Sequence, residues 1–409
     1  MRILYFTQFF SPENIAGAFR AHDHAVAWAE KGHDVTVFTG WPNYPAGKLF
    51  DGYAMERLGE ESVDGVRVFR SQSKMQANTS FKKRIESGLS FVINGLRNTR
   101  GNSPIGKDYD AVLATSGTVF AAWLGVRYAK KNRLPLVVEF RDLTYRQMAA
   151  TGSSESCAKV KAMKACELSF CKAADKVVVL TEGFGRELAL QGVPESKMAV
   201  VPNGADPVFC EHDWTGALRL GYFGTMGISQ DVVRTLDFAA GLAREGLLGS
   251  YDLVGEGASR GVVEEGIASG AYPFASLSRG VPMDELEPRY ASAHMTVASL
   301  RRNASFAGTI PSKIFQSFAR GTPVLFVGPE GEAARLVRES GGGIALCGGD
   351  AECAEALREF AGGPDLPGRL AAMGASARSF MERNYTRSQM AERMLGILED
   401  AAAGIRRKR

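Results

Sequence analysis

The sequence lacks several features that would place it in other classes of protein. Its six cysteines include no CxxC pair and no spacing typical of metal ligands, which indicates reduced thiols in a cytoplasmic protein. No apolar run approaches the roughly 18 residues of a membrane-spanning helix. The net charge of +4 gives no reason to expect nucleic acid as a partner. The glycine fingerprint GxGxxG is also absent, which disfavours a nicotinamide-dependent enzyme.

The chain instead has length and a regular alternation of short apolar runs with helix-length segments. Its 409 residues are too many for one core and suggest two domains of about 200 residues each. Short buried strands separated by helices predict parallel sheets covered on both faces. We therefore expect an α/β protein with two doubly wound, Rossmann-like domains facing across a cleft. The expected parts are an N-terminal domain at 1–205, a C-terminal domain at 206–385, and a final helix with a basic tail at 386–409, for which a return to the N-terminal domain is one option.

The expected strands fix where ligands would bind, because ligands of doubly wound sheets lie beyond the carboxyl ends of the strands. The apolar start MRILYFTQFF leads directly into Ser11-Pro12 and predicts a first strand rather than a signal peptide. The expected strands lie at residues 3–6, 35–39, 65–70, 111–114, 136–140, 176–180 and 200–201 in the first half, and at 218–223, 251–254, 275–277, 295–299 and 324–327 in the second.

The most informative segment is GTIPSKIFQSFARGTPVLFVG, residues 308–328. Pro311 and Ser312 predict the start of a helix, with Ser312 as its capping residue. The free backbone N–H groups at that start, together with Lys313 and Gln316, predict a site for a phosphate and its sugar. An ordinary helix–strand unit with Lys and Gln on its surface is the alternative.

Other strand ends in the second half offer donors for a diphosphate. Gly224 and Thr225, in the turn GYFGTMG, contribute backbone N–H groups and a hydroxyl, and Glu256 follows the next strand in the similar turn LVGEG. Arg301 and Arg302 suit phosphate oxygens, because guanidinium groups donate in pairs. Two adjacent arginines cannot both point inward from a regular strand, so one of them can be solvated.

The first half offers candidate acceptor-binding residues after its first two strands. Gly17, in SPENIAGAFR, lets the backbone approach a ligand closely, and Arg20 could pair with an anion or lie on the helix surface. The loop WPNYP presents Asn43 and Tyr44 between two prolines, an arrangement found both in sugar sites and in purely structural corners.

Three ionisable residues, Glu139, Arg141 and Asp142, stand at the end of the expected strand 136–140. Such groups are costly to place at a strand end unless they pair or react. Asp142 is the candidate for taking a proton from an incoming hydroxyl, and Glu139 and Arg141 would orient Asp142 or the acceptor. A local ion pair is the alternative.

Residues 80–100 form a segment of a different kind, with an apolar helical face and basic residues at both ends. The expected apolar face consists of Phe81, Ile85, Leu89, Val92 and Leu96. A basic amphipathic helix is typical of membrane-surface anchors, and the basic tail 406–409 would add attraction to anionic lipid. The alternative is a helix packed on the sheet with a charged outer face.

Together these residues resemble the family 4 glycosyltransferases, the retaining GT-B enzymes. The likeness is greatest to the subgroup that builds bacterial surface polysaccharides from UDP-linked N-acetylated sugars. It covers nearly the whole chain, through residues 5–45 and the segments VEFRDL, ADKVVVLTEGF, VVPNGAD, LVGEG and GTIPSKIFQSFARGTPVL. The chain departs from the family pattern at Gly308 and Gln316, which stand in place of two glutamates. Gln316 can still hydrogen-bond a ribose, but without the added strength of a charge.

The resemblance implies a retaining, metal-independent enzyme without a cofactor, in which the second domain holds a UDP-sugar and the first holds the acceptor. The departing diphosphate would help to deprotonate the acceptor, which would leave Asp142 as a positioning group. Basic side chains and helix dipoles would neutralise the leaving group in place of a metal.

We therefore expect a glycosyltransferase that moves a sugar from UDP to a glycan or polyprenyl-linked acceptor, in the cytoplasm and at the inner face of the cell membrane. A nucleotide-sugar epimerase of the same fold is a second option, which isomerisation of UDP-GlcNAc without acceptor would reveal. A non-catalytic partner subunit that has lost the two glutamates is a third, and it would not bind UDP.

Overall fold

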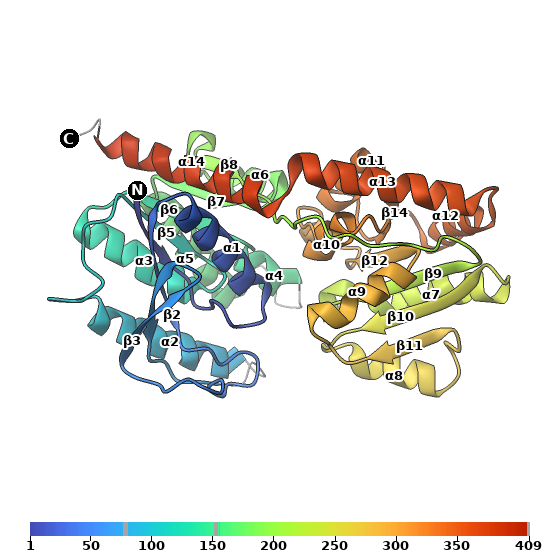
Figure 1. The fold of residues 1–409 in the computed structure, drawn as a ribbon, viewed down its shortest axis with the longest axis horizontal. Coiled ribbons are helices and arrows are strands. Elements are labelled where there is room, and N and C mark those ends of the chain that lie inside the picture. The colour runs from blue at the N-terminus through green and yellow to red at the C-terminus, as the bar shows by residue number, and fades with distance from the viewer. Residues whose placement is uncertain (77–80, 151–153, 155, 407–409) are drawn as a thin grey trace. The chain divides into compact units, whose positions relative to one another are not determined.

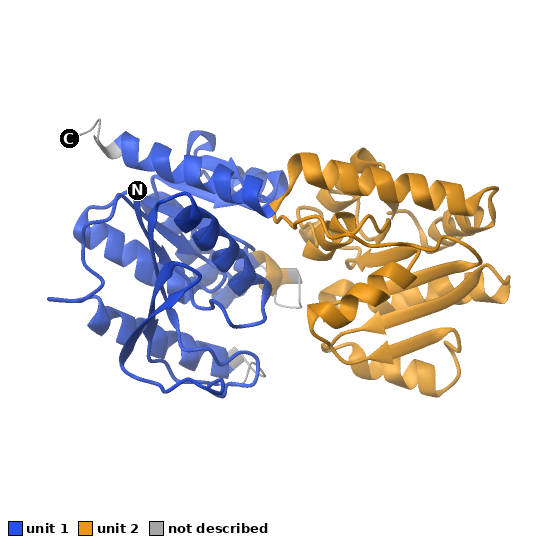
Figure 2. Cartoon of the chain, viewed as in Figure 1, with its two compact units in different colours: residues 1–145, 154–202, 387–409 blue, residues 146–153, 203–386 orange. Residues whose placement is uncertain are grey.

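The computed structural model describes residues 1–76, 81–150, 154 and 156–406 and divides into two compact units. Unit 1 consists of Met1–Tyr145, Ser154–Pro202 and Arg387–Arg409, and unit 2 consists of Arg146–Ser153 and Asn203–Thr386 (Figures 1 and 2). The sequence-based boundaries were expected after residues 205 and 385. Ser80 and the tail residues 407–409, which the sequence analysis assigned to membrane binding, lie outside the described residues.

Within the described residues, unit 1 is built on an eight-stranded sheet in the order β3-β4-β2-β1-β5-β6-β7-β8. Its strands are β1 Arg2–Phe6, β2 Asp34–Gly40, β3 Leu58–Val63, β4 Val66–Ser71, β5 Ala111–Thr115, β6 Leu136–Phe140, β7 Lys176–Val179 and β8 Met198–Val200. Neighbouring strands are parallel, except that β3 pairs antiparallel with β4. Every residue of β5 and β6 is buried, as expected for the central strands of a parallel sheet.

Helices pack against this sheet, and the last of them returns from the C-terminal end of the chain (Figure 1). They are α1 Ala16–Glu30, α2 Phe81–Asn98, α3 Val119–Asn132, α5 Ala158–Ala173, α6 Glu182–Leu190, the short 3₁₀ turn η1 Glu195–Lys197 and α14 Arg387–Arg406, while α4 Thr144–Ala150 is divided between the two units. Helix α14 packs against α1, where the indole Nε1 of Trp28 donates to the carbonyl of Ala391 at 2.8 Å. Helices α2 and α3 pack side by side, and Gly95 of α2 leaves room for the side chain of Leu124.

The described part of unit 2 contains a six-stranded, parallel sheet in the order β11-β10-β9-β12-β13-β14. Its strands are β9 Leu218–Phe223, β10 Leu248–Val254, β11 Ala275–Ser278, β12 Met295–Ser299, β13 Val324–Val327 and β14 Gly343–Leu346. Its helices are η2 Ile228–Gln230, α7 Val232–Arg244, α8 Arg260–Ala268, α9 Met283–Ser292, η3 Ala304–Phe306, α10 Ser312–Ala319, α11 Glu332–Ser340, α12 Asp350–Gly362 and α13 Leu366–Asn384. Strands β10, β9 and β12 are neighbours, so the loops that follow them share one edge of the sheet.

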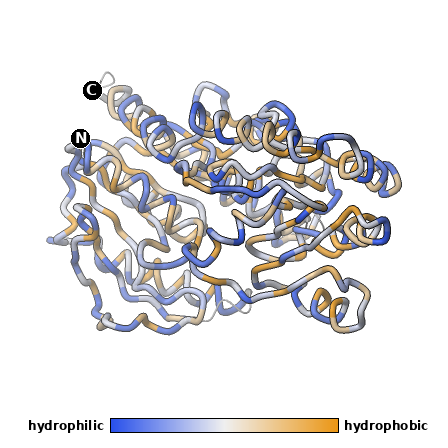
Figure 3. The backbone as a smooth tube through the Cα atoms, turned by 45° about the vertical axis from the view of Figure 1, so that its right-hand side comes forward, coloured by the Kyte–Doolittle hydropathy of each residue, from blue (hydrophilic) through white to orange (hydrophobic). Residues whose placement is uncertain are grey.

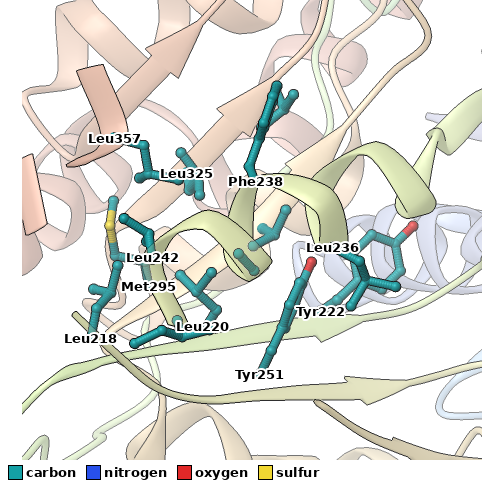
Figure 4. Close-up of a cluster of buried hydrophobic side chains, with 14 of the residues drawn as sticks. Leu218, Leu220, Tyr222, Leu236, Phe238, Leu242, Tyr251, Met295, Leu325 and Leu357 are labelled. Carbon is teal, nitrogen blue, oxygen red and sulfur yellow. The ribbon is translucent and has the colours of Figure 1, made fainter. Parts of the chain in front are cut away.

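Helix α7 packs on this sheet through a cluster of buried hydrophobic side chains (Figure 4). The cluster includes Leu218, Leu220, Tyr222, Leu236, Phe238, Leu242, Tyr251, Met295, Leu325 and Leu357. Burial of each large apolar side chain stabilises the fold by about 1.5–3 kcal/mol. The hydroxyl of Tyr251 stays paired inside the cluster, with Thr235 Oγ1 at 2.8 Å. Along the helices of Figure 3, hydrophobic and hydrophilic residues alternate, as expected when one face packs on a sheet and the other faces solvent.

The structure confirms the α/β class and most of the expected strands, and it adds two strands that the sequence analysis missed. Strand β3 lies at the edge of its sheet and contains mostly polar, partly exposed residues, so its apolar signal is weak. Strand β14 begins at the last residue of a run of three glycines, a composition that argues against a strand. None of the described helices combines the length and the apolar character needed to span a bilayer.

Candidate functional site

Two glycine-containing loops meet at the carboxyl ends of β9 and β10 in unit 2. The Gly224 N–H donates to the carbonyl of Val254 at 2.9 Å. A Cβ atom on Gly255 would lie 1.9 Å from the carbonyl oxygen of Gly224, so only a glycine fits there. The two backbones therefore pack directly on each other, and the side chains of Thr225 and Glu256 are exposed at this edge of the sheet.

The side chain of Lys313 reaches the same edge from helix α10. Its ammonium lies 3.4 Å from the centre of the Tyr222 ring, and a Cβ atom on Gly224 would lie 3.7 Å from Lys313 Nζ. The Nζ atom is buried, and no described residue accepts a hydrogen bond from it. A buried ammonium without an anion is costly, because nothing replaces the hydration that it has lost. The structure thus brings together Lys313 and Gly224, two of the residues expected to bind the donor.

The environment of Lys313 changes its charge at neutral pH. Burial lowers the pKa of Lys313 from 10.5 to about 7. The ring of Tyr222 offsets part of this effect, since a cation over the face of an aromatic ring is attracted to it. An incoming phosphate would supply the missing counter-charge and restore the ammonium. Unit 2 contains no other lysine in its sequence, so no second lysine of this unit could replace it.

Helix α10 begins differently from the expectation. The N-cap position is Pro311, and Ser312 is the first helical residue, so the prediction that Ser312 caps the helix was wrong. Because no side chain caps this end in the described structure, the first amide groups of α10 are left for solvent or a ligand. Gly308 lies half-buried in the preceding loop.

The carboxamide of Gln316 is held by Arg320, one turn further along the chain. Arg320 Nη1 donates to Gln316 Oε1 at 3.1 Å, and Arg320 Nε donates to Glu287 Oε2 at 2.8 Å. Arg320 is almost fully buried, and its guanidinium stacks over the ring of Tyr290 at 4.5 Å. This network fixes the oxygen of Gln316 and leaves its amide nitrogen as the group that can meet a ribose. The sequence analysis missed Arg320 and Glu287, because no local pattern links two residues 33 positions apart.

The two adjacent arginines after β12 differ in their surroundings. Arg302 Nη1 lies 3.5 Å from Asp350 Oδ1, which also pairs with Arg234 at 2.8 Å. Arg301 is exposed, and its guanidinium makes no hydrogen bond or ion pair with any described residue. Arg301 is therefore available to a diphosphate, whereas Arg302 is drawn toward the first residue of α12.

In unit 1, Arg20 and Glu139 form a buried ion pair. Arg20 Nε lies 2.8 Å from Glu139 Oε1, and its two Nη atoms donate to the carbonyls of Val201 and Pro202 at 2.8 and 2.6 Å. Arg20 is 7% exposed and Glu139 is 0% exposed. The pair ties α1 to β6 and to the segment after β8, so neither side chain is offered to a ligand.

The charge state of this pair follows from its surroundings. Burial raises the pKa of Glu139, but the neighbouring positive charges, that of Arg20 above all, hold it below its usual value. Burial also lowers the pKa of His24, a buried neighbour on α1, to about 3, so this imidazole stays neutral. Glu139 is thus a fixed carboxylate that positions Arg20, and a role in proton transfer does not follow from its contacts.

Glu13, which the sequence analysis did not single out, holds the WPNYP loop. Its Oε1 accepts from the N–H groups of Asn43 and Tyr44, both at 3.0 Å, and its Oε2 accepts from that of Phe10 at 3.3 Å. Burial raises the pKa of Glu13 to about 7, against the opposing effect of these N–H groups. The side-chain nitrogen of Asn43 donates to the carbonyl of Trp41 at 2.7 Å, so part of this amide serves the loop itself.

Asp142 lies half-buried between β6 and α4. The start of α4 is held by a second carboxylate that the sequence analysis missed, since Glu167 of α5 accepts from the N–H groups of Thr144 at 3.0 Å and Tyr145 at 3.4 Å. Burial raises the pKa of Glu167, and the nearby charge of Asp142 adds to this rise. The segment that carries Asp142 is therefore anchored directly after its strand.

The structure also brings together Gly17 and Arg141. A Cβ atom on Gly17 would lie 2.0 Å from Arg141 Nη1, so the guanidinium rests on the bare backbone of the first turn of α1. Gly117, in the loop after β5, lies against the same group. The glycine that was expected to approach a ligand therefore approaches Arg141.

Helix α2 exposes a narrower apolar surface than expected. Leu89 is 49% exposed, whereas Val92, expected on the same face, is buried. Ile93, one turn after Leu89, is 50% exposed, and Trp123 of the neighbouring α3 is 38% exposed. The helix therefore packs on its unit, and its outer face carries two adjacent apolar side chains among basic residues. Membrane binding by this face stays a prediction.

Comparisons with known proteins agree with this architecture. Residues 17–204 match the model of the glycosyl transferase 4-like domain, whereas a search of curated proteins finds no match. Sucrose-phosphate synthase from Thermosynechococcus elongatus aligns over 99% of this chain and 100% of its own, at 14% identity and a TM-score of 0.74. HepE of Anabaena, in complex with UDP, aligns over 98% of this chain and 100% of its own, at 14% identity and a TM-score of 0.68. WaaG, a glycosyltransferase involved in lipopolysaccharide biosynthesis, aligns over 97% of this chain and 99% of its own, at 13% identity and a TM-score of 0.66.

These solved structures share the architecture of the chain over almost its entire length. The expected GT-B fold is therefore confirmed. The chain has the GT-B fold of these glycosyltransferases, and its residues 17–204 match a glycosyl transferase 4-like domain.

Proposed function

We propose that this protein is a retaining glycosyltransferase that moves an N-acetylated hexose from UDP to a glycan or lipid-linked acceptor in the synthesis of a bacterial surface polysaccharide. The bond between the anomeric carbon and the phosphate oxygen breaks, and the anomeric carbon forms a new bond to the acceptor oxygen. The acceptor proton passes to the departing diphosphate, and UDP is released. No cofactor or metal ion takes part in this scheme. The GT-B fold and the match of residues 17–204 support the class of reaction.

The observation that carries the proposal is the buried ammonium of Lys313, which lacks a hydrogen-bond partner among the described residues. It lies beside Gly224 and belongs to the first turn of α10, whose start has no capping side chain in the described structure. A diphosphate at this place would meet a positive charge, the free amides of the helix start and the guanidinium of Arg301. This arrangement supports donor binding by unit 2 without a metal. The binding of UDP by HepE of Anabaena, which shares the fold, also supports a UDP-linked donor.

The other candidate residues of unit 2 would bind the remaining parts of the donor. Gln316 would meet the ribose through its amide nitrogen, because Arg320 occupies its oxygen. From the two glycine loops, the exposed hydroxyl of Thr225 would meet the diphosphate, and the exposed carboxylate of Glu256 would accept from hydroxyl groups of the sugar. Arg302 would contribute only long-range charge, since it leans toward Asp350.

Unit 1 would hold the acceptor at the carboxyl edge of its own sheet. Asn43 and Tyr44 would contact the acceptor from the WPNYP loop, which Glu13 holds in place. Asp142 would orient the acceptor hydroxyl, while the departing diphosphate takes the proton. Arg20 and Glu139 would keep the shape of this edge as a buried pair.

Attachment to the inner face of the cell membrane is part of the proposal. Leu89 and Ile93 of α2 and Trp123 of α3, all exposed, would enter the lipid interface. Exposed basic residues would meet anionic headgroups; they are Lys82, Lys83, Arg84, Arg97 and Arg100 of the α2 segment and Arg127, Lys130 and Lys131 of α3.

Isothermal titration calorimetry of the full chain with UDP and with pyrophosphate tests the donor site. We expect Lys313→Ala to weaken the binding of both ligands. Arg244→Ala, which removes the same charge from the exposed last residue of α7, should leave both affinities unchanged. Gln316→Ala should weaken UDP but not pyrophosphate, because Gln316 is assigned to the ribose.

Incubation with UDP-GlcNAc separates the alternatives. An intact donor in the absence of acceptor agrees with a transferase, whereas an isomerised sugar would assign an epimerase of the same fold. A protein that fails to bind UDP would contradict the proposal and favour a non-catalytic subunit, in line with the missing glutamates at Gly308 and Gln316.

A further inference from the structure

Arg141 stands where three adjacent strands of unit 1 end. Strands β1, β5 and β6 lie side by side in the sheet, and Arg141 is the first residue after β6. Its guanidinium packs on Gly17, in the first turn of the helix after β1, and on Gly117, in the loop after β5. A Cβ atom at Gly17 would lie 2.0 Å from Nη1 and 2.6 Å from both Cζ and Nη2, and one at Gly117 would lie 3.2 Å from Cζ. Only bare backbone leaves room for the guanidinium in this position.

The side chain of Arg141 has no directly bonded partner in the part of the chain that the structure describes, although its charge acts through space on the buried Glu139 and Tyr5. It makes no hydrogen bond or ion pair there, although Asp142 follows it directly. Arg20, by contrast, uses three nitrogens on Glu139 and two backbone carbonyls. Because Arg141 is half-buried, its five N–H donors are neither fully hydrated nor paired within the protein.

Two hydroxyl groups next to Gly117 also lack a partner among the described residues. Thr115 is 1% exposed and Ser116 is 2% exposed, and neither side-chain oxygen takes part in a hydrogen bond. Buried hydroxyl groups nearly always find a partner, because an unmade hydrogen bond is costly. In addition, the first turns of α1 and α3, the helices that follow β1 and β5, contain no acidic residue. This edge thus combines an unpaired cation with unpaired hydroxyl groups, and both can bind an anion.

We infer that Arg141, seated on Gly17 and Gly117, binds a phosphate group of the acceptor. A guanidinium donates two parallel hydrogen bonds that match the spacing of phosphate oxygens. The inference rests on the proposed function and deepens it, since a neutral glycan offers no anion whereas a lipid-linked acceptor carries a phosphate or pyrophosphate. Arg141 would therefore select phosphate-bearing acceptors and would not transfer a proton. The diphosphate of the donor is the other source of the same chemistry, and the experiment separates the two.

The test compares farnesyl phosphate with farnesol, which differ in the phosphate, as ligands of the full chain in calorimetry. We expect the unmodified protein to bind farnesyl phosphate at least tenfold more tightly than farnesol. Arg141→Ala should abolish this difference, and Arg141→Lys should retain part of it. Gly17→Ala should act like Arg141→Ala, because its methyl group would take the place of Nη1 and push the flexible end of the side chain aside. Gly396→Ala, at a glycine of α14 with no neighbouring atom near its Cβ position, is the matched control and should behave like the unmodified protein.

UDP affinity, measured on the same variants, distinguishes the two sources of phosphate. Unchanged UDP affinity in Arg141→Ala and Gly17→Ala supports the acceptor assignment. Loss of UDP affinity in these variants would assign Arg141 to the donor and overturn the inference, as would equal binding of farnesyl phosphate and farnesol by the unmodified protein. The unmodified protein could bind farnesyl phosphate more tightly than farnesol, lose this difference in Arg141→Ala, and yet not bind UDP. In that case the proposed function is wrong while the phosphate site remains. Thermal unfolding checks that each variant is folded. If Gly17→Ala does not fold, Arg141→Lys still tests the inference.

Discussion

The ammonium of Lys313 lies 3.4 Å from the ring centre of Tyr222, and no described residue accepts a hydrogen bond from it. The two residues come from α10 and β9, so the contact joins the start of the helix to the end of the strand. Without a ligand, this buried ammonium reduces the free energy of unfolding, because its lost hydration is not replaced. With a diphosphate bound, the paired ammonium would raise the free energy of unfolding instead of reducing it.

Lys313→Met should separate stability from binding. Methionine keeps the apolar stem and removes the buried amine, so we expect the free energy of unfolding of the ligand-free protein to rise by about 1 kcal/mol. The same variant should lose about 1–3 kcal/mol of UDP binding, the scale of a lost charged hydrogen bond. Urea unfolding and calorimetry measure the two effects. A variant with reduced stability and unchanged UDP affinity would remove Lys313 from the donor site.

UDP binding should be accompanied by proton uptake. Above the lowered pKa of about 7, Lys313 is mostly neutral in the free protein, and a bound diphosphate favours its charged form. UDP affinity should therefore fall as the pH rises from about 7 to about 9. Calorimetry in buffers of different ionisation enthalpy should show the uptake, and Lys313→Met should show neither effect. Binding without proton exchange at about pH 8 would speak against a lysine with this pKa in the site.

The same shift makes stability depend on pH. The unfolded chain binds more protons than the folded one between about pH 7 and pH 10.5, so the contribution of Lys313 to the free energy of unfolding rises across that range. Unfolding curves of the unmodified protein and Lys313→Met should therefore converge as the pH rises toward 10.5.

Glu13 should lower the stability of the protein between mildly acidic and neutral pH. Its pKa is about 7 in the folded chain and close to 4.5 in the unfolded chain, so the folded chain binds more protons between these values. Its contribution to the free energy of unfolding is full below about pH 4.5 and is lost as the pH rises through 7. Glu13→Gln is neutral at every pH and should lack this dependence. Denaturant unfolding at several pH values checks the prediction, and parallel pH profiles for the two proteins would refute it.

Removal of one partner from the Arg20–Glu139 pair should destabilise the protein strongly. Glu139→Ala leaves a buried guanidinium without its counter-charge, and the expected loss is about 3–5 kcal/mol in the free energy of unfolding. Replacement of both residues, Arg20→Met with Glu139→Leu, should recover much of that loss, because no buried charge is left uncompensated. A double-mutant cycle in urea measures the coupling, and simple additivity of the single losses would show that the pair is not coupled.

The outer face of α2 should bind anionic membranes. Leu89→Ser with Ile93→Ser should reduce sedimentation with vesicles of phosphatidylcholine and phosphatidylglycerol, because both side chains are about half exposed. Leu190→Ser is the control, since Leu190 is 80% exposed on α6 and has no assigned role. Equal sedimentation of the unmodified protein and the double variant would rule out this face as the anchor.

The strands of both sheets could be predicted because each buried parallel strand is a short, continuous apolar run. Strands β6 and β9 coincide with the expected ranges 136–140 and 218–223. The route of the last helix could not be settled in the same way, because its packing on α1 depends on long-range contacts such as that of Trp28 with Ala391. Periodicity gives the faces of a helix but not the partner of each face.

The candidate site could be predicted only where a local pattern marks it. A glycine turn at a strand end identified Gly224, the expected helix start at Pro311 and Ser312 identified Lys313, and the glycine-containing loop after the first strand identified Gly17. The pattern shows that a small residue is needed at Gly17, but it does not show that the guanidinium of Arg141 fills the space. The role of Glu13 could not be predicted either, because its carboxylate binds backbone amides 30 and 31 positions away, which leave no trace in residue types.

A crystal structure of the full chain soaked with UDP tests the central claim most directly. The account predicts density for the diphosphate within hydrogen-bond distance of Lys313 Nζ and beside Gly224. Diphosphate density elsewhere on the protein, with Lys313 Nζ still buried against Tyr222 and unpaired, would contradict it.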